Sequence, residues 1–286
     1  MSFYSPEVVE KIKSLEGPPK VYKNIFTRTD IAKLLEIEEK SINNRMVDRE
    51  DSRKTKFDLM SKVGDIINPK IERVLDRKVN VGDFPAHFIK NKYPLRVHAD
   101  MGKDPSLVPH KNILIPLEVK GDNPTHTILF NQRWYGKSSL FSAAGNTSAD
   151  HFFKDKFGKF IHVKDSSSLL NLIEKNLGKT IEINGGKFDC STKTVEEIKA
   201  LLKQSRYSDR TNKHITSDVP FNKLNYERYL SHQPYEDLKS LSIDRAITWY
   251  PGDIIVFDRS TIHCASNFLK EGVSEKTAIA MFTIWK

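Results

Sequence analysis

The stretch Arg96–Asp100 reads Arg-Val-His-Ala-Asp, and the organisation of this 286-residue chain follows from it. Side chains alternate between the two faces of a strand, so His98 and Asp100 project the same way and can reach one metal ion together. A third ligand stands far downstream, at His263. Two imidazoles and one carboxylate form the facial triad that binds non-haem Fe(II) and leaves positions open. We therefore interpret His98, Asp100 and His263 as metal ligands.

Strand-like segments follow the pair His98 and Asp100, and others lie around His263. Residues 112–119 and 125–130 are rich in apolar and β-branched side chains and are separated by the turn signal Gly-Asp-Asn-Pro. Strand character returns at 254–257, 262–268 and 277–285. Because two ligands lie early and one lies late, the pattern predicts an α+β protein. Its core is expected to be a double-stranded β-helix, a closed antiparallel barrel of the jelly-roll, cupin-like type.

The residues before this core have helical spacing. The apolar positions predict a short helix over 5–15, a second helix capped by Thr29, and a long helix over 48–76 that is interrupted at Pro69. We therefore expect residues 1–78 to form an N-terminal helical region packed on the core.

The core domain is then expected over 79–286, with a long insertion over about 134–246. The insertion combines short strand-like segments with helical patterns at 169–177 and 195–202. Its glycines and the polar segment 205–213 indicate loops and a mobile lid facing the substrate. No internal repeat is evident in the chain.

The last strand-like segment carries a second functional signal. Lys276 opens it, and period-two alternation places Lys276, Ala278, Ala280 and Phe282 on one face. A cation followed by two small side chains leaves room for a small anion and supplies its counter-charge. We expect Lys276 to bind the carboxylate of such a molecule.

Further polar side chains are expected near the same pocket. Arg96 shares the face of His98 and is expected to touch substrate or co-substrate, with a salt bridge at the rim as the alternative. Asn112 and Thr127 lie on neighbouring strands, and either of them is placed to hydrogen-bond the small anion. Trp134 and Trp249 are interpreted as packing residues.

Taken together, these residues resemble the Fe(II)- and 2-oxoglutarate-dependent oxygenases, in the prolyl-hydroxylase-like or phytanoyl-CoA-dioxygenase-like branch. The resemblance lies in the His-x-Asp pair at His98 and Asp100, in the Pro-Gly-Asp run at 251–253 that leads to His263, and in the basic residue Lys276. It covers roughly 79–285, and the central insertion has no counterpart. In that family the basic residue is often an arginine nearer the distal histidine, whereas lysine serves in the prolyl-hydroxylase branch.

The resemblance implies a set of cofactors and roles. The two histidines and the aspartate would bind Fe(II), and 2-oxoglutarate would chelate the metal while Lys276 holds its far carboxylate. Dioxygen would be the other co-substrate, and a C–H bond of an unidentified primary substrate would be hydroxylated with release of succinate and CO2. The catalytic residues implied are His98, Asp100 and His263, with Lys276, Asn112, Thr127 and Arg96 around the co-substrate.

The other histidines are expected to have other roles. His110 and His126 lie in the strand-rich half and are rival ligands, although neither sits in a matching motif. Five more are interpreted as surface residues: His87, His151, His162, His214 and His232. A non-catalytic cupin-like barrel that only holds metal remains an alternative function.

The net charge of +9, from 46 basic and 37 acidic residues, weakly favours an anionic partner such as nucleic acid. Residues 156–164 interleave lysines with aromatic residues, as in single-strand platforms, but an edge strand kept soluble by lysines is the favoured interpretation. Nucleic-acid binding or nucleobase modification therefore stays an alternative rather than the expectation.

Two cysteines fit neither a disulfide framework nor a zinc site. No apolar run approaches the roughly 20 residues of a membrane span, and the first residues lack the apolar core of a signal peptide. A cytoplasmic protein without membrane partners is expected, with its oligomeric state undetermined.

Overall fold

The computed structural model describes residues 3–48, 52–58, 60–79, 86–141, 151–157, 160–163, 166–183, 185–204, 210–211 and 213–286. The chain divides into two compact units, one formed by 1–138 with 214–286 and the other by 139–213. Among the described residues, no helix is both long and apolar enough to cross a membrane.

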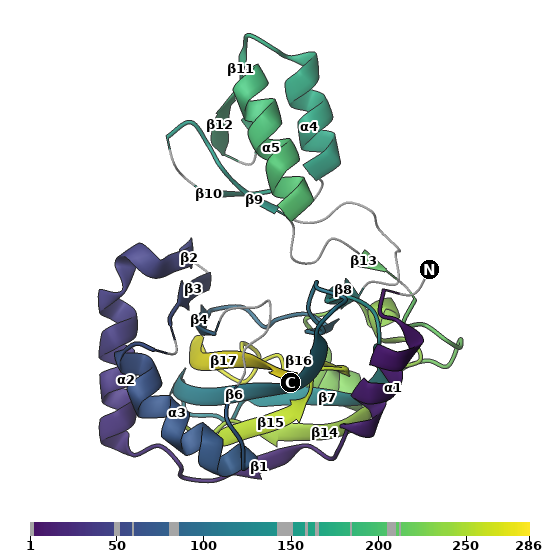
Figure 1. Cartoon of the computed structure of the whole chain (residues 1–286). Helices are drawn as coiled ribbons and strands as arrows, with labels where there is room; N and C mark the ends of the chain where they lie inside the picture. The colour runs from purple at the N-terminus through teal and green to yellow at the C-terminus, as the bar shows by residue number, and fades with distance from the viewer. Residues whose placement is uncertain are drawn as a thin grey trace. The chain divides into compact units, whose positions relative to one another are not determined.

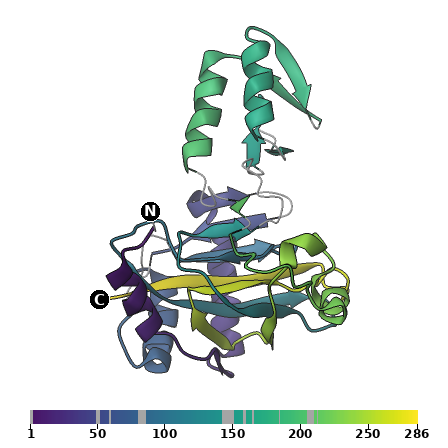
Figure 2. The same ribbon diagram turned by 90° about the vertical axis from the view of Figure 1, so that its right-hand side faces the viewer.

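The first unit contains a large antiparallel sheet with the strand order β1-β15-β6-β17-β4-β3-β2 (Figure 1). Its strands are β1 (Lys20–Tyr22), β2 (Arg45–Asp48), β3 (Ser52–Lys56), β4 (His87–Asn91), β6 (Val108–Lys120), β15 (Ile254–Asp258) and β17 (Glu275–Trp285). In Figure 2 the yellow strand β17 runs through the middle of the first unit, because it pairs with β6 on one side and β4 on the other. The two ends of the chain thus build one sheet.

A second antiparallel sheet of the first unit has the order β5-β16-β7-β14. These strands are β5 (His98–Ala99), β7 (His126–Arg133), β14 (Ile243–Thr248) and β16 (Thr261–Ala265). The helical elements of this unit are α1 (Pro6–Ser14), α2 (Arg28–Lys40), η1 (Ile42–Asn44), α3 (Lys62–Leu75), α6 (Lys223–Asn225), η2 (Tyr226–Leu230) and η3 (Tyr235–Leu238). Helices and antiparallel sheets are therefore mixed in one α+β unit, as the sequence predicts.

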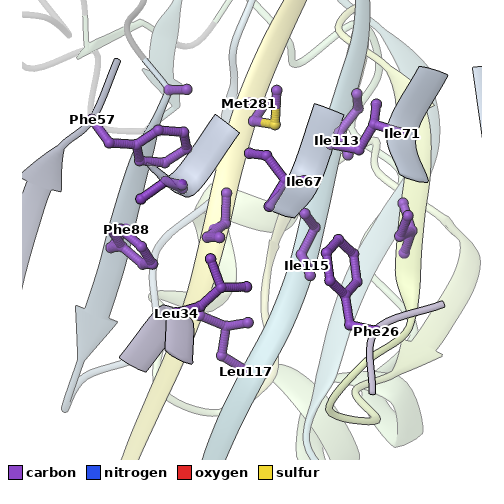
Figure 3. Close-up of a cluster of buried hydrophobic side chains, with 14 of the residues drawn as sticks. Phe26, Leu34, Phe57, Ile67, Ile71, Phe88, Ile113, Ile115, Leu117 and Met281 are labelled. Atoms are coloured by element: carbon purple, nitrogen blue, oxygen red, sulfur yellow. The ribbon is translucent and has the colours of Figure 1, made fainter. Parts of the chain in front are cut away.

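The large sheet has an outer face covered by helices α2 and α3. Figure 3 shows Leu34 of α2 and Ile67 of α3 packed against strand residues such as Ile115 and Met281. These side chains are almost completely buried. Burial of each large aliphatic side chain contributes roughly 1.5–3 kcal/mol, so this cluster accounts for much of the unit's stability.

The inner face of the large sheet meets the second sheet. Ala278 of β17 and Phe257 of β15 pack in one cluster with Leu129 of β7 and Ile247 of β14. On β17, Ala278, Ala280 and Phe282 lie in the inner clusters, whereas Ile279 and Met281 lie in the outer one. The predicted alternation along the last strand is thus confirmed for these residues.

The first two helices follow the expected pattern with one change of cap. Pro6 is the first residue of α1, and the hydroxyl of Ser5 accepts the amide of Val8. Helix α2 is capped by Thr27 rather than by Thr29, because Thr27 and Asp30 form a reciprocal capping box. The helix begins after Thr27 because the carboxylate of Asp30, three residues later, closes the capping box with it.

The long helix expected over 48–76 was a wrong prediction. Strands β2 and β3 form a hairpin across 45–56 at the edge of the large sheet, and α3 begins only at Lys62. Edge pairing with β4 outweighed the helical spacing of a few apolar residues. Pro69 lies inside α3 instead of interrupting it. Residue 59, within the predicted helix, and residues 80–85, at the start of the predicted core domain, lie outside the described residues.

The second unit, 139–213, lies within the insertion expected at 134–246 and has its own core. Two hairpins each precede a helix, so the order hairpin-helix occurs twice. Its elements are β8 (Ser139–Phe141), β9 (His151–Lys154), β10 (Phe160–Val163), α4 (Ser166–Lys175), β11 (Thr180–Ile183), β12 (Gly186–Asp189), α5 (Thr192–Gln204) and β13 (Arg210–Thr211). This structural repetition was not evident in the sequence, although Gly-Lys-Phe occurs at 158–160 and at 186–188.

Candidate metal centre

Strands β5 and β16 place two histidines opposite each other. His263 is the cross-strand partner of His98, and the centroids of their rings lie 4.1 Å apart. Asp100 follows two residues after His98, at the end of the same short segment. The cross-strand pairing therefore brings His263 to two side chains that lie 165 and 163 residues before it in the sequence, His98 and Asp100.

The three side chains converge on one point. The Oδ2 atom of Asp100 lies 3.5 Å from Nε2 of His98 and 3.3 Å from Nε2 of His263. One ligand atom from each residue lies within 4.8 Å of the other two. The exposed fractions are 4% for His98, 6% for Asp100 and 7% for His263. Across the described residues, this is the group of His, Cys, Asp or Glu side chains that has the spacing of a metal site.

Both imidazoles are oriented in the same way by their own strands. Nδ1 of His98 lies 2.7 Å from the carbonyl of Arg96, and Nδ1 of His263 lies 2.9 Å from the carbonyl of Thr261. A carbonyl only accepts hydrogen bonds, so each Nδ1 donates, and in the neutral ring the lone pair is left on Nε2. The two Nε2 atoms face Asp100, which is the arrangement that metal-binding histidines need.

The charges of the buried group also suit a cation. Burial by itself would raise the pKa of Asp100, but His98 and the hydrogen bond from His263 outweigh it and hold that pKa well below the usual value. Burial, with His98 beside it, lowers the pKa of His263. An ionised carboxylate beside two imidazole nitrogens is the donor set that a divalent transition metal takes. The residues therefore fit an Fe(II) ion.

The interior beyond the triad leads to Lys276. Phe257 packs against His263 with ring centroids 4.8 Å apart, and it shares a cluster with Trp249. The ammonium of Lys276 lies 3.7 Å from the centroid of the Trp249 ring. The indole of Trp249 donates to Thr127, with Nε1 and Oγ1 2.7 Å apart. Trp249 is thus a packing residue, as expected, and it also supports two polar groups.

Lys276 is a buried cation, with an exposed fraction of 5%. Its Nζ lies 3.4 Å from the hydroxyl of Thr125, and no carboxylate of the described residues lies within ion-pair distance of it. Burial lowers the pKa of Lys276 to about 7, although Glu271 and Cys264 act in the opposite direction. A buried ammonium without a counter-ion is costly, so it indicates a place for an anionic ligand.

Asn112 is the second buried polar group on the inner face of the large sheet. It lies on β6 beside Phe257 of β15 and Phe282 of β17. Neither its amide oxygen nor its amide nitrogen has a hydrogen-bond partner among the described residues. Leu114, on the same face of β6, belongs to the inner clusters. Asn112 thus lies on the inner face of the large sheet, while its role toward a co-substrate stays a prediction.

Arg96 and Thr127, the two other predicted contacts of the co-substrate, have different hydrogen bonds in the structure. The carbonyl of Arg96 accepts from His98, a main-chain contact that the sequence did not suggest, while its half-buried side chain lies near His232. The hydroxyl oxygen of Thr127 accepts from Trp249, and its hydrogen is left to donate to a carboxylate ligand. Their roles toward a co-substrate stay predictions.

The rival histidines lie apart from the triad. His110 packs against Trp285, and burial lowers its pKa to about 4, while His126 packs against Tyr229. Some histidines interpreted as surface residues are in fact buried. His87 and His214 are 2% and 4% exposed, the latter bonded to the carbonyl of Asp237, and His232 is half-buried. A single histidine carries no local signal that distinguishes a core position from a surface one.

Several side chains that hold the ligand segment were missed from the sequence. The amide of Val97 donates to Gln233, the carbonyl of Asp100 accepts from Arg259, and the carbonyl of Met101 accepts from Tyr4. These partners are 136, 159 and 97 residues away in the chain. No local pattern reports such contacts.

No family model matches this chain, and no curated protein matches it. Solved structures do match. A prolyl-4-hydroxylase from Pseudomonas putida has 9% identity and a TM-score of 0.39, with 98% of this chain and 99% of that chain covered.

Two further solved structures have similar values. HygX from Streptomyces hygroscopicus, with nickel and 2-oxoglutarate bound, has 12% identity and a TM-score of 0.40 over 98% of this chain and 87% of that chain. The non-haem α-ketoglutarate-dependent carbocyclase SnoK has 10% identity and a TM-score of 0.41 over 99% and 86%. These neighbours are of the oxygenase class that the sequence resembles. Because the TM-scores are below 0.5, the roles of residues are inferred from the site itself.

Proposed function

We propose that this protein is an Fe(II)- and 2-oxoglutarate-dependent oxygenase. It would convert 2-oxoglutarate, dioxygen and a substrate C–H bond into succinate, CO2 and a hydroxylated product. The observation that carries the proposal is the buried convergence of His98, Asp100 and His263, with both Nε2 atoms directed at the carboxylate. The proposal includes a double-stranded β-helix core over 79–286, with its insertion over about 134–246.

Each residue of the triad has a defined task. His98 and His263 would present neutral Nε2 atoms, and Asp100 would add one negative charge, so that one face of the metal is occupied by protein. Fe(II) held there supplies the redox chemistry with dioxygen, which belongs to the metal rather than to the side chains. The protein contributes orientation, through the Nδ1 contacts to main-chain carbonyls, and exclusion of bulk water by burial.

The co-substrate would extend from the triad toward Lys276. The ammonium of Lys276 would pair with the far carboxylate of 2-oxoglutarate, and the unpartnered amide of Asn112 would hydrogen-bond it. Ala278 and Ala280 lie on the same inner face of β17, where their small side chains would leave room for the co-substrate. Thr127 and Arg96 are further proposed contacts of the co-substrate.

The test of this proposal separates the triad from the rival histidines. Wild type, His98→Ala, Asp100→Ala and His263→Ala are loaded anaerobically with Fe(II), and bound iron is measured after gel filtration. Wild type should retain about one iron per chain, and each variant should lose most of it. On addition of 2-oxoglutarate, dioxygen and ascorbate, which supplies two electrons in place of the unidentified substrate, wild type should release succinate and the three variants should not.

The matched controls are His110→Ala and His126→Ala, which remove histidines from the same strand-rich half. Both should keep iron and succinate release. Iron retained by His263→Ala at the wild-type level would remove this residue from the triad. Iron bound normally by wild type without any consumption of 2-oxoglutarate would instead identify a non-catalytic barrel.

A further inference from the structure

The ligand segment is held by little regular structure. Strand β5 is two residues long, His98–Ala99, and its described register with β16 is the single pair His263 and His98. Asp100 lies beyond the end of that strand. A backbone ladder therefore does not by itself fix the direction in which Asp100 projects its carboxylate.

Arg259 supplies a contact at this point. Its Nε donates to the carbonyl of Asp100 at 2.6 Å, and its Nη1 donates to the carbonyl of Thr283 at 3.3 Å. The exposed fraction of Arg259 is 1%, and it is the largest of the fully buried side chains in the described chain. The guanidinium thus links the end of the ligand segment to strand β17.

The chemistry of this contact requires an arginine. A guanidinium is planar and offers donors in a fixed fork, so it can reach two carbonyls at once, whereas an ammonium on a flexible stem acts as a point charge. Burying a charged group is costly unless its hydrogen bonds are satisfied. Packing alone at this position would be served better by an apolar residue, so the cation is expected to have a task.

We infer that Arg259 is a positioning residue for the metal centre, which holds the main chain of Asp100 so that its carboxylate faces Nε2 of both histidines. The inference rests on the proposed function, because it concerns the same triad. Arg259 is not one of the three proposed ligands, and it would act on the metal centre through the main chain of Asp100. Tyr4 has a parallel contact, since its hydroxyl donates to the carbonyl of Met101 at 2.6 Å.

The test uses Co²⁺ as a probe, because its affinity and its visible absorption both report on the ligand set. Wild type, Arg259→Met and Arg259→Lys are titrated with Co²⁺ in the absence of any co-substrate. Arg259→Met should bind Co²⁺ on the order of 10-fold to 100-fold more weakly than wild type, as for other residues that orient metal ligands. Its spectrum at saturation should differ, because the carboxylate no longer meets the metal in the same geometry.

Arg259→Lys should lie between the two, since it keeps the charge but cannot span both carbonyls. If Arg259→Met does not yield folded protein, the comparison is made with Arg259→Lys. Ile71→Ala is the matched control, because it removes buried volume from the outer cluster, away from the triad. It should lower the melting temperature of the metal-free protein and leave the Co²⁺ affinity and spectrum unchanged.

Each outcome decides between the two claims. Arg259 variants that bind Co²⁺ as tightly as wild type, with the same spectrum, overturn the inference and leave the proposed function intact. Equal weakening in Ile71→Ala also overturns it, because Arg259 would then act only through global stability. A wild-type protein that binds no Co²⁺ overturns the proposed function and this inference together.

Discussion

The two faces of the large sheet differ in what they bury. The outer face, between the strands and helices α2 and α3, is an apolar cluster that contains Ile115, Ile279 and Met281 (Figure 3). The inner face of the same strands carries Asn112 and Lys276 among small and aromatic side chains. Both faces are buried, yet among the described residues only the inner one carries an unpartnered amide, Asn112, and an ammonium without a counter-ion, Lys276.

This difference separates stability from binding. A buried polar group without a partner costs roughly 1–3 kcal/mol, and a buried charge costs more. On the outer face the neutral hydroxyl of Thr277 lacks a partner in the described part of the chain, but the surrounding cluster is apolar and can be understood as packing. On the inner face, the burial of Asn112 and Lys276 lowers the free energy of unfolding, and a bound anion would offset this loss of stability. Substitutions on opposite faces of one strand should therefore have opposite consequences.

The largest effect is expected from Lys276→Met on the inner face. Loss of one partner of a buried charge pair typically costs about 2–5 kcal/mol, so the affinity for 2-oxoglutarate should fall on the order of 1,000-fold. Stability should be unchanged or higher, because a buried charge without a counter-ion is removed. Calorimetric titration of 2-oxoglutarate into the metal-loaded protein, with a parallel denaturant melt, checks both statements. An unchanged affinity would mean that another residue binds the far carboxylate.

The reverse is expected of Met281→Ala on the outer face of the same strand. Truncation of a fully buried side chain leaves a cavity and costs about 2–5 kcal/mol of the free energy of unfolding. The affinity for 2-oxoglutarate should stay within a factor of about two, since the outer cluster does not reach the pocket. Urea unfolding of the metal-free protein measures the first quantity. A loss of 2-oxoglutarate affinity like that of Lys276→Met would remove the distinction between the two faces.

A smaller effect is expected from Asn112→Leu. The leucine has nearly the same volume and removes two amide atoms that lack partners, so stability should be unchanged or slightly raised. The affinity for 2-oxoglutarate should fall about 10-fold, the value of one hydrogen bond to a charged group. Ile113→Val, the neighbouring residue on the outer face, is the control for a change in β6. A strong loss of stability in Asn112→Leu would show that the amide has a structural partner.

The smallest effect concerns pH. With the pKa of Lys276 lowered to about 7 by burial, the unfolded chain binds more protons than the ligand-free protein between about pH 7 and pH 10.5. The stability of ligand-free protein should therefore rise with pH in this window, and 2-oxoglutarate should suppress the rise. Binding at pH 8 should also take up close to one proton, measured by calorimetry in two buffers of different ionisation enthalpy. Lys276→Met should show no uptake, and equal uptake in both proteins would assign it elsewhere.

Local patterns predicted the parts of the site that lie within one strand. His98 and Asp100 could be paired from period-two spacing alone, and the same rule placed Ala278 and Ala280 on the inner face. The prediction of His263 as the third ligand required a sheet that joins strands distant in the sequence. The cross-strand pairing of His263 with His98 is such a contact. The placement of His98 with Asp100 and of Ala278 with Ala280 could be predicted because each pair depends on a few consecutive residues.

The features that were missed depend on distant contacts. The edge hairpin at 45–56 is stabilised by pairing with β4, which spacing within the segment does not report. Arg259 lies in an Asp-Arg-Ser turn that reads as exposed, and only its partners Asp100 and Thr283 explain its burial. The repeated hairpin-helix order of 139–213 was hidden because its two halves share little sequence beyond Gly-Lys-Phe.

The central claim is that the triad and Lys276 together make one site for iron and 2-oxoglutarate. It is tested most directly by incubating the Fe(II)-loaded protein with 2-oxoglutarate and ascorbate, which supplies the two electrons that a substrate C–H bond would otherwise provide, under air and under nitrogen, and measuring succinate and CO2. The account predicts equal amounts of both products, formed only when iron and dioxygen are present, and none from His263→Ala. Stoichiometric iron binding with 2-oxoglutarate left unconsumed would contradict it.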